Sequence, residues 1–140
     1  MKVIRYIMVA MLLAAVATGA NAKQVKMQHL YMFGFSASFK DSTLYVTDIQ
    51  DVQGAWVDTK TKFLLERDSY SQQLRTWLAD NKKENNRVCL VIFATSKSKA
   101  EKKLAKLKKK YSGKKSVPYD IRYLSSQDFK FTPIEISSEQ

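Results

Sequence analysis

The apolar residues of this chain change their spacing several times, and one unbroken apolar run lies between two segments with helical spacing. The run extends from Val88 to Ala94 and predicts a strand that is central in a sheet and buried on both sides. Helices are predicted from about Ser69 to Asn81 and from about Ser98 to Tyr111, because apolar residues recur there every three or four positions. These residues are Tyr70, Leu74, Trp77 and Leu78 in the first helix and Ala100, Leu104, Leu107 and Tyr111 in the second.

Two strands are predicted before the first helix. They cover Gln28 to Phe39 and Thr43 to Val52, and the short turn Lys40-Asp41-Ser42 between them indicates an antiparallel hairpin. Gly34 lies inside the first strand and predicts a bulge or a close approach of another group to the backbone. The stretch from Trp56 to Leu65 is expected to be a loop with a short helical turn.

A further strand is predicted after the second helix, from Tyr119 to Leu124, where apolar and polar residues alternate. Phe129 to Ile136 is expected to add a short strand at an edge, limited by Pro133. The predicted order is β-β-α-β-α-β. The expected fold is an α/β (α+β) two-layer sandwich: a mixed sheet of four to five strands with both helices on one face.

The first 22 residues have the pattern of a secretory signal peptide. Lys2 and Arg5 precede an apolar run from Ile7 to about Ala17, and the segment ends with small residues at Ala20 and Ala22. The run is shorter than the roughly 20 apolar residues of a membrane span. We therefore expect cleavage between Ala22 and Lys23, export to the periplasm or the medium, and a single domain formed by residues 23–140.

Composition supports a packed core without disulfides. Hydrophobic residues make up 45% of the chain and aromatic residues 11%, which is too much for a disordered basic protein. Cys89 is the single cysteine, and it lies within the apolar run from Val88 to Ala94. A buried thiol of this kind behaves as a small hydrophobic side chain.

The basic charge is concentrated in one segment. The formal charge is +11, and removal of residues 1–22 leaves 22 basic residues against 13 acidic ones, a charge of +9. The segment from Lys97 to Lys115 holds ten lysines and a single acid, Glu101, which is also +9. The rest of residues 23–140 is therefore neutral on balance.

This segment predicts an anion-binding surface of low specificity. It contains no Arg to read bases and only one aromatic residue, Tyr111, to stack on them, which disfavours nucleic acid. The expected partner is an anionic polymer or lipid headgroup of the cell envelope, or a protein. A solvated helix face without a partner is the open alternative. The candidate anion-binding residues are Lys99, Lys102, Lys103, Lys106, Lys108, Lys109, Lys110, Lys114 and Lys115.

Residue patterns for catalysis are missing from the sequence. His29 is the single histidine and has no nucleophile at a recognisable spacing, so a structural role is expected. Phosphate loops, nucleophile elbows and Cys/His metal patterns do not occur. We expect no catalytic residue, no metal ligand and no cofactor. An enzyme is the third alternative, and it would require His29 and at least one acid to converge in a cleft.

These observations predict a small, exported, non-enzymatic accessory protein that docks on an anionic envelope component through its lysine-rich helix. The alternative is a protein-interaction or small-ligand module. It would use the aromatic face of the hairpin, with Tyr31, Phe33, Phe35 and Tyr45, and the lysine-rich helix would then serve only solubility.

Overall fold

The structure, a computed structural model, describes residues 23–112 and 118–136. Within these ranges the chain forms seven strands and two helices. The elements are β1 (Gln24–Lys26), β2 (Tyr31–Ala37), β3 (Thr43–Thr47), β4 (Gln50–Asp51), β5 (Trp56–Asp58), α2 (Arg67–Lys82), β6 (Val88–Ala94), α3 (Lys97–Ser112) and β7 (Asp120–Leu124).

Five strands form one mixed sheet, as expected. β2 pairs antiparallel with β6 on one side, and on the other side with β3 and then with β4. β7 pairs with β3 in parallel and forms the opposite edge. The prediction of a mixed sheet combined with two helices in the order β-β-α-β-α-β is therefore confirmed, with β1, β4 and β5 as small additions.

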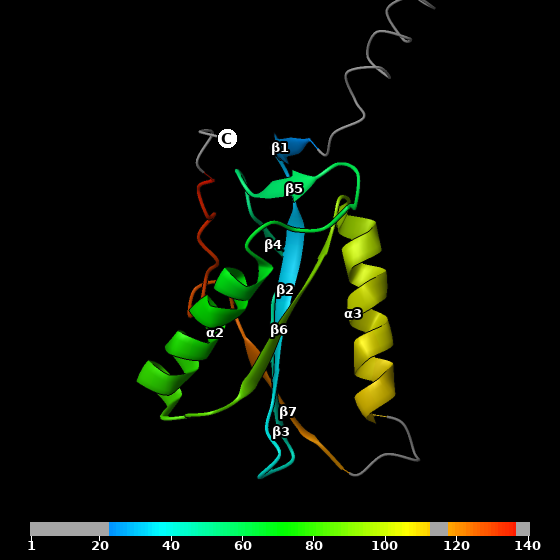
Figure 1. Cartoon of the computed structure of the whole chain (residues 1–140). Coiled ribbons are helices and arrows are strands. Elements are labelled where there is room, and N and C mark those ends of the chain that lie inside the picture. The colour runs from blue at the N-terminus through cyan, green and yellow to red at the C-terminus, as the bar shows by residue number, and fades with distance from the viewer. Residues whose placement is uncertain (1–22, 113–117, 137–140) are drawn as a thin grey trace, which may run out of the picture.

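The two helices cover opposite faces of this sheet, so the prediction that both lie on one face is wrong. Side chains of β2 alternate between the faces. Met32 packs in the same cluster as Leu74 and Leu78 of α2, whereas Phe33 packs in the cluster that Leu104 of α3 joins. Figure 1 shows α2 and α3 on the two sides of the sheet. The domain is a sandwich of helix, sheet and helix.

The directions of the two crossovers explain this placement. β3, β6 and β7 run the same way, because β3 and β6 are both antiparallel to β2 and β7 is parallel to β3. The connection through α2 leads from the β3 side to β6 at one edge, and the connection through α3 leads back across the sheet to β7. Connections between parallel strands are right-handed in nearly all proteins. The two connections cross the sheet in opposite directions. Because both are right-handed, they must lie on opposite faces of the sheet.

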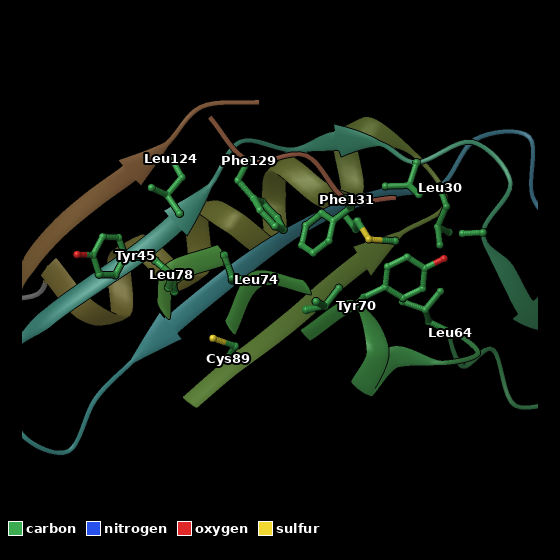
Figure 2. Packing of buried hydrophobic residues seen from close by; sticks show 14 residues of the cluster. Leu30, Tyr45, Leu64, Tyr70, Leu74, Leu78, Cys89, Leu124, Phe129 and Phe131 are labelled. Carbon is green, nitrogen blue, oxygen red and sulfur yellow. The ribbon is translucent and has the colours of Figure 1, made fainter. Parts of the chain in front are cut away.

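The larger core lies on the α2 face (Figure 2). Tyr70, Leu74 and Leu78 of α2 are fully buried against the sheet, and Trp77 packs at the margin of the cluster, as the spacing predicts. A Cβ on Gly34 would lie 2.7 Å from Leu74 Cδ2, so the expected close approach at this glycine is confirmed. The smaller core lies under α3, where Leu104, Leu107 and Tyr111 pack on four buried side chains of β2 and β3: Phe33, Phe35, Leu44 and Val46.

Two expectations for the C-terminal half are wrong. β6 is an edge strand, since it pairs only with β2 among the described residues, and its Leu90 and Val88 are exposed. The residues from Phe129 to Ile136 form no strand. Phe129 and Phe131 instead fill the α2-face core as an extended segment, because burying their rings there stabilises more than edge pairing would.

The elements before α2 also differ from expectation. The second predicted strand is split into β3 and β4. Trp56–Asp58 forms a strand that pairs with β1, where a loop with a helical turn was expected. α2 begins after Glu66, two residues before the predicted start at Ser69, and the Glu66 side chain makes no capping hydrogen bond to the backbone. Ser69 Oγ contacts Glu66 Oε2 at 3.0 Å.

The two-stranded ribbon β1–β5 joins both ends of the described chain. The carbonyl of Lys23 accepts a hydrogen bond of 2.9 Å from the Thr59 N–H. Lys26 Nζ lies 3.6 Å from a carboxylate oxygen of Glu135. The first and last described segments therefore meet at the end of the domain that carries the ribbon (Figure 1).

Candidate functional site

The candidate site is the outer surface of α3, which the short connection after β6 positions. The carbonyl of Ser96 accepts the Ala100 N–H at 3.1 Å, and Ser96 Oγ accepts the Lys99 N–H at 3.3 Å, so Ser96 caps the first turn. Ala100 is fully buried, and Leu104 and Tyr111 are half-buried against the sheet. This contact fixes the rotation of the helix and thereby the direction in which its lysines project.

The lysines of α3 are not spread evenly around its exposed surface. Residues of a helix are separated by about 100° around its axis, and the buried stripe sets the inward direction. Six of the eight lysines of α3 then lie within an arc of about 120°. These six, called the lysine arc below, are Lys99, Lys102, Lys103, Lys106, Lys109 and Lys110. The remaining exposed positions of the helix include Ser98, Glu101, Ala105 and Ser112.

Contacts with the sheet show which way the lysine arc faces. Lys103 Nζ donates a hydrogen bond of 2.8 Å to the carbonyl of Phe93 in β6. On the opposite flank of the helix, Lys108 Nζ lies 4.9 Å from the ring centroid of Tyr123 in β7. The lysine arc therefore faces the β6 edge of the sheet, and Lys108 lies outside it.

Ion pairs do not neutralise this charge. The ion pairs among residues 23–112 and 118–136 involve Lys26, His29, Arg87 and Arg122 as cations, and none involves a lysine of α3. Glu101 is the single acid of the helix. Of the candidate anion-binding residues, Lys114 and Lys115 lie outside the described residues. The structure brings Lys99, Lys102, Lys103, Lys106, Lys109 and Lys110 together on one side and separates Lys108 from them.

His29 lies beside an acid, which the sequence did not indicate. Its Nδ1 is 2.7 Å from Asp51 Oδ2, because the residues that follow His29 enter β2 and pair with β4. A hollow of about 610 Å³ lies beside it, lined by Lys26, Met27, Gln28, His29, Gln53 and Gly54. That lining contains no Ser, Thr or Cys that an imidazole base could activate. His29 and an acid thus converge beside a hollow, as the enzyme alternative requires, while the hydroxyl or thiol nucleophile of a triad is missing from this lining.

Metal ligands and the single thiol are the remaining groups to consider in the described part of the chain. No group of three or more His, Cys, Asp or Glu side chains there is arranged to hold a metal ion. Cys89 is buried as expected, with its Sγ 3.5 Å from Ser36 Oγ, and burial raises the pKa of this thiol. A helix with the length and apolar character of a membrane span does not occur among the described residues.

Arg87 is a buried charge that the sequence analysis did not single out. Its Nε donates to Ser36 Oγ at 2.9 Å and its Nη2 to the carbonyl of Thr43. Carboxylates of Glu84 and Asp41 lie at 3.4 and 3.6 Å from its Nη1. These contacts join the turn after β2 to the beginning of β6.

The hairpin of β2 and β3 has no exposed aromatic face. Phe33, Phe35 and Tyr45 are buried in the two cores, and Tyr31 is half-buried. This burial counts against a binding role for these rings.

Comparisons with models of protein families, with curated proteins and with solved structures found no match to this chain.

Proposed function

We propose that this protein is an exported, non-enzymatic accessory protein that docks on an anionic component of the cell envelope through the lysine arc. The single observation that carries the proposal is the asymmetry of α3. Six lysines without an ion pair to any described residue gather within one arc, while the rest of the solvent-facing helix surface carries only Lys97 and Lys108 together with two serines, one alanine and one glutamate.

The asymmetry has an energetic cost that solubility alone does not explain. Like charges three or four residues apart destabilise a helix by about 0.2–0.5 kcal/mol per pair. Lys102, Lys106 and Lys109 follow one another at these spacings. Lysines interspersed with acids would keep the protein equally soluble without this repulsion. A surface of bound anions removes the repulsion and replaces it with attraction.

The chemistry of the lysine arc suits repeated phosphate or carboxylate groups rather than one shaped ligand. Lysine binds anions as a flexible point charge, whereas arginine provides a fixed fork for two oxygens. The two sizeable hollows of the described structure lie at the α2–C-terminal segment and beside His29, and neither contains a lysine of α3. Near an anionic membrane, each such lysine contributes about 1 kcal/mol of attraction.

The test compares two variants of the chain from Lys23 to Gln140, which contains every described contact. In the first, Lys102, Lys106, Lys109 and Lys110 are replaced by Gln. In the matched control, the same replacement is made at Lys60, Lys62, Lys82 and Lys130, which are exposed and lie outside α3. Both variants lose the same charge, and only the first changes the lysine arc.

Binding is measured to soluble inorganic polyphosphate and to anionic vesicles at low and high salt. We expect the lysine-arc variant to bind more than tenfold more weakly, at about fivefold per lysine with partial screening, and the control to bind nearly as the unmodified chain. If binding weakens equally in both variants, the loss of net charge alone explains the effect. That result would contradict the proposal.

A further inference from the structure

We propose that the anionic partner of the lysine arc is a lipid bilayer, and that Leu90, Val88 and Phe39 enter its headgroup region beside the lysines. This inference rests on the proposed function and deepens it by naming the partner. It starts from three apolar side chains that the fold leaves in water.

These side chains are among the most exposed large apolar groups of the described structure. Phe39 is 97% exposed, Leu90 50% and Val88 41%. Leu90 and Val88 belong to β6, and Phe39 lies two residues beyond Ala37, whose Cα partner in the sheet is Val88. The three positions therefore lie at one end of the sheet, at the turn after β2 and the beginning of β6 (Figure 1).

Leu90 and Val88 share the face of the sheet that α3 covers. Successive side chains of a strand point to opposite faces. Ile92 packs against the cluster under α3, whereas Cys89 and Val91 belong to the α2-face core. Leu90 and Val88 are two and four residues before Ile92, so their side chains point to the same face as Ile92. They remain exposed because the apolar stripe of α3 packs mainly on β2 and β3.

The lysine arc lies next to this exposed strip. Lys103 reaches the carbonyl of Phe93 at the other end of β6. Leu90 is the Cα partner of Phe35 in β2, and the ring of Phe35 stacks with Tyr111 of α3 at a centroid distance of 5.2 Å. Leu90 is thereby placed alongside the last two turns of α3, which carry Lys106, Lys109 and Lys110.

The free edge of β6 is protected at one end and left open at the other. The carbonyl of Val91 accepts Arg67 Nε at 2.9 Å and Arg67 Nη2 at 2.6 Å, and the carbonyl of Phe93 accepts Lys103. Charged side chains in such positions prevent another strand from pairing with the edge. The exposed apolar strip begins at Leu90, on the N-terminal side of the carbonyls that Arg67 and Lys103 cover.

Apolar groups beside lysines fit a bilayer better than a soluble polyanion. A soluble polyphosphate would contact the charges and leave Leu90, Val88 and Phe39 in water. At a membrane surface, lysines attract anionic headgroups while neighbouring apolar side chains gain free energy by leaving water among the lipid chains. Lysine keeps its charged end at the headgroups while its methylene groups lie along apolar surface.

The experiment uses the chain from Lys23 to Gln140 and a second pair of variants. Leu90→Ser with Phe39→Ser removes two side chains of the strip. Phe63→Ser with Val25→Ser is the matched control, because Phe63 is 66% and Val25 38% exposed and both belong to the segments around the β1–β5 ribbon. All four side chains are exposed, and circular dichroism is used to check that each variant is folded.

Binding is measured to phosphatidylcholine vesicles with and without about 30% phosphatidylglycerol, an anionic content that gives a strong surface potential, and to soluble inorganic polyphosphate. We expect the Leu90/Phe39 variant to bind anionic vesicles about tenfold or more weakly and polyphosphate unchanged, because only the bilayer offers an apolar phase. The Phe63/Val25 variant is expected to match the unmodified chain in both assays.

Three outcomes would overturn the inference. If the Leu90/Phe39 variant binds vesicles as well as its control, the partner is recognised by charge alone and the proposed function stands without the bilayer. If replacing the lysines of the arc changes neither assay, the proposed function itself fails. If the unmodified chain forms a dimer that Leu90→Ser dissociates, a second copy covers the strip.

Discussion

Arg87 and Cys89 show how two buried polar side chains are accommodated around one hydroxyl. Both contact Ser36 Oγ, at 2.9 and 3.5 Å respectively. Arg87 also bonds the carbonyl of Thr43 and lies 4.9 Å from the ring centroid of Tyr45. A buried charge is tolerated when its hydrogen-bond donors are used in this way. The Cys89 thiol packs beside this charge as a neutral group. Because burial raises its pKa, the stability of the fold is expected to depend on pH.

We expect the free energy of unfolding to fall above about pH 8.5, and to fall less in Cys89→Ala. Burial raises the pKa of the Cys89 thiol, and the Ser36 contact and the nearby Arg75 and Arg87 offset only part of this shift. Above the pKa of the unfolded thiol, the unfolded chain has released a proton that the folded chain retains. Stability therefore declines as pH rises, by at most about 1.4 kcal/mol per pH unit for one proton.

The measurement is urea unfolding of both proteins at pH 7 and pH 9.5. Burial also raises the pKa of Tyr70, so the unmodified chain loses further stability at higher pH, and this loss is common to both proteins. The difference between the two proteins isolates the thiol. An identical decline in both would show that Cys89 titrates in the folded state as it does in the unfolded chain.

The pair His29 and Asp51 marks the limit of prediction at the level of residues. The two are 22 positions apart, and their contact depends on the pairing of β2 with β4. Residue spacing along the sequence contains no information on which strand lies beside His29. The burial of Cys89 was predictable because it depends on the apolar residues adjacent to it in sequence.

At the level of elements, β6 combines two roles that sequence patterns do not separate. Its continuous apolar character predicts a central strand, yet it is an edge whose carbonyls at Val91 and Phe93 are covered by Arg67 and Lys103. An edge strand between two helices can be as apolar as a central one. The side chains that protect it come from helices that are distant in sequence.

We expect the double variant Arg67→Ala and Lys103→Ala to associate through the uncovered edge of β6. Without the two cations, the carbonyls of Val91 and Phe93 are free to accept hydrogen bonds from another strand. Sedimentation velocity across a range of concentrations measures the association. Lys82→Ala with Lys106→Ala is the control. It also removes one cation from each helix, but Arg67 and Lys103 still cover the two carbonyls. A monomer at all concentrations in both variants would contradict the expectation.

The helices were predictable to within two residues at each end, whereas the sheet order was not. The stripes of α2 and α3 are local patterns, and each determines its own buried face. The side of the sheet on which each helix lies depends on which edge β6 occupies, which is set by pairing across long stretches of chain. β1 and β5 are too short to produce a recognisable pattern.

At the level of the whole molecule, the two halves of the sandwich are unequally packed. α2 buries Tyr70, Ser71, Leu74 and Leu78, whereas Ala100 is the single fully buried residue of α3. Helical stability in proteins comes mostly from such tertiary packing, and repulsion within the lysine arc weakens α3 further. The domain is therefore expected to open first on the α3 face.

We expect amide hydrogens of α3 to exchange about tenfold or more faster than those of α2 and β2, because local opening exposes less apolar surface there. Addition of anionic vesicles is expected to slow exchange in α3, because bound anions relieve the repulsion between the lysines of α3. Exchange in α2 is expected to stay unchanged. Hydrogen exchange followed by mass spectrometry measures both effects. Equal protection of the two helices would show that the α3 interface is as stable as the larger core.

The meeting of the two described ends at the β1–β5 ribbon bears on how the chain can be re-engineered. Lys26 contacts Glu135 across this end, and the exposed Asn85 and Asn86 lie at the opposite one. A short linker between the first and last described segments, at residues 23 and 136, and a new opening between Asn85 and Asn86 would give a circular permutant with every strand pairing retained. In that permutant a fluorophore or surface tether attached to a new terminus would lie beside β6 and report directly on its surroundings.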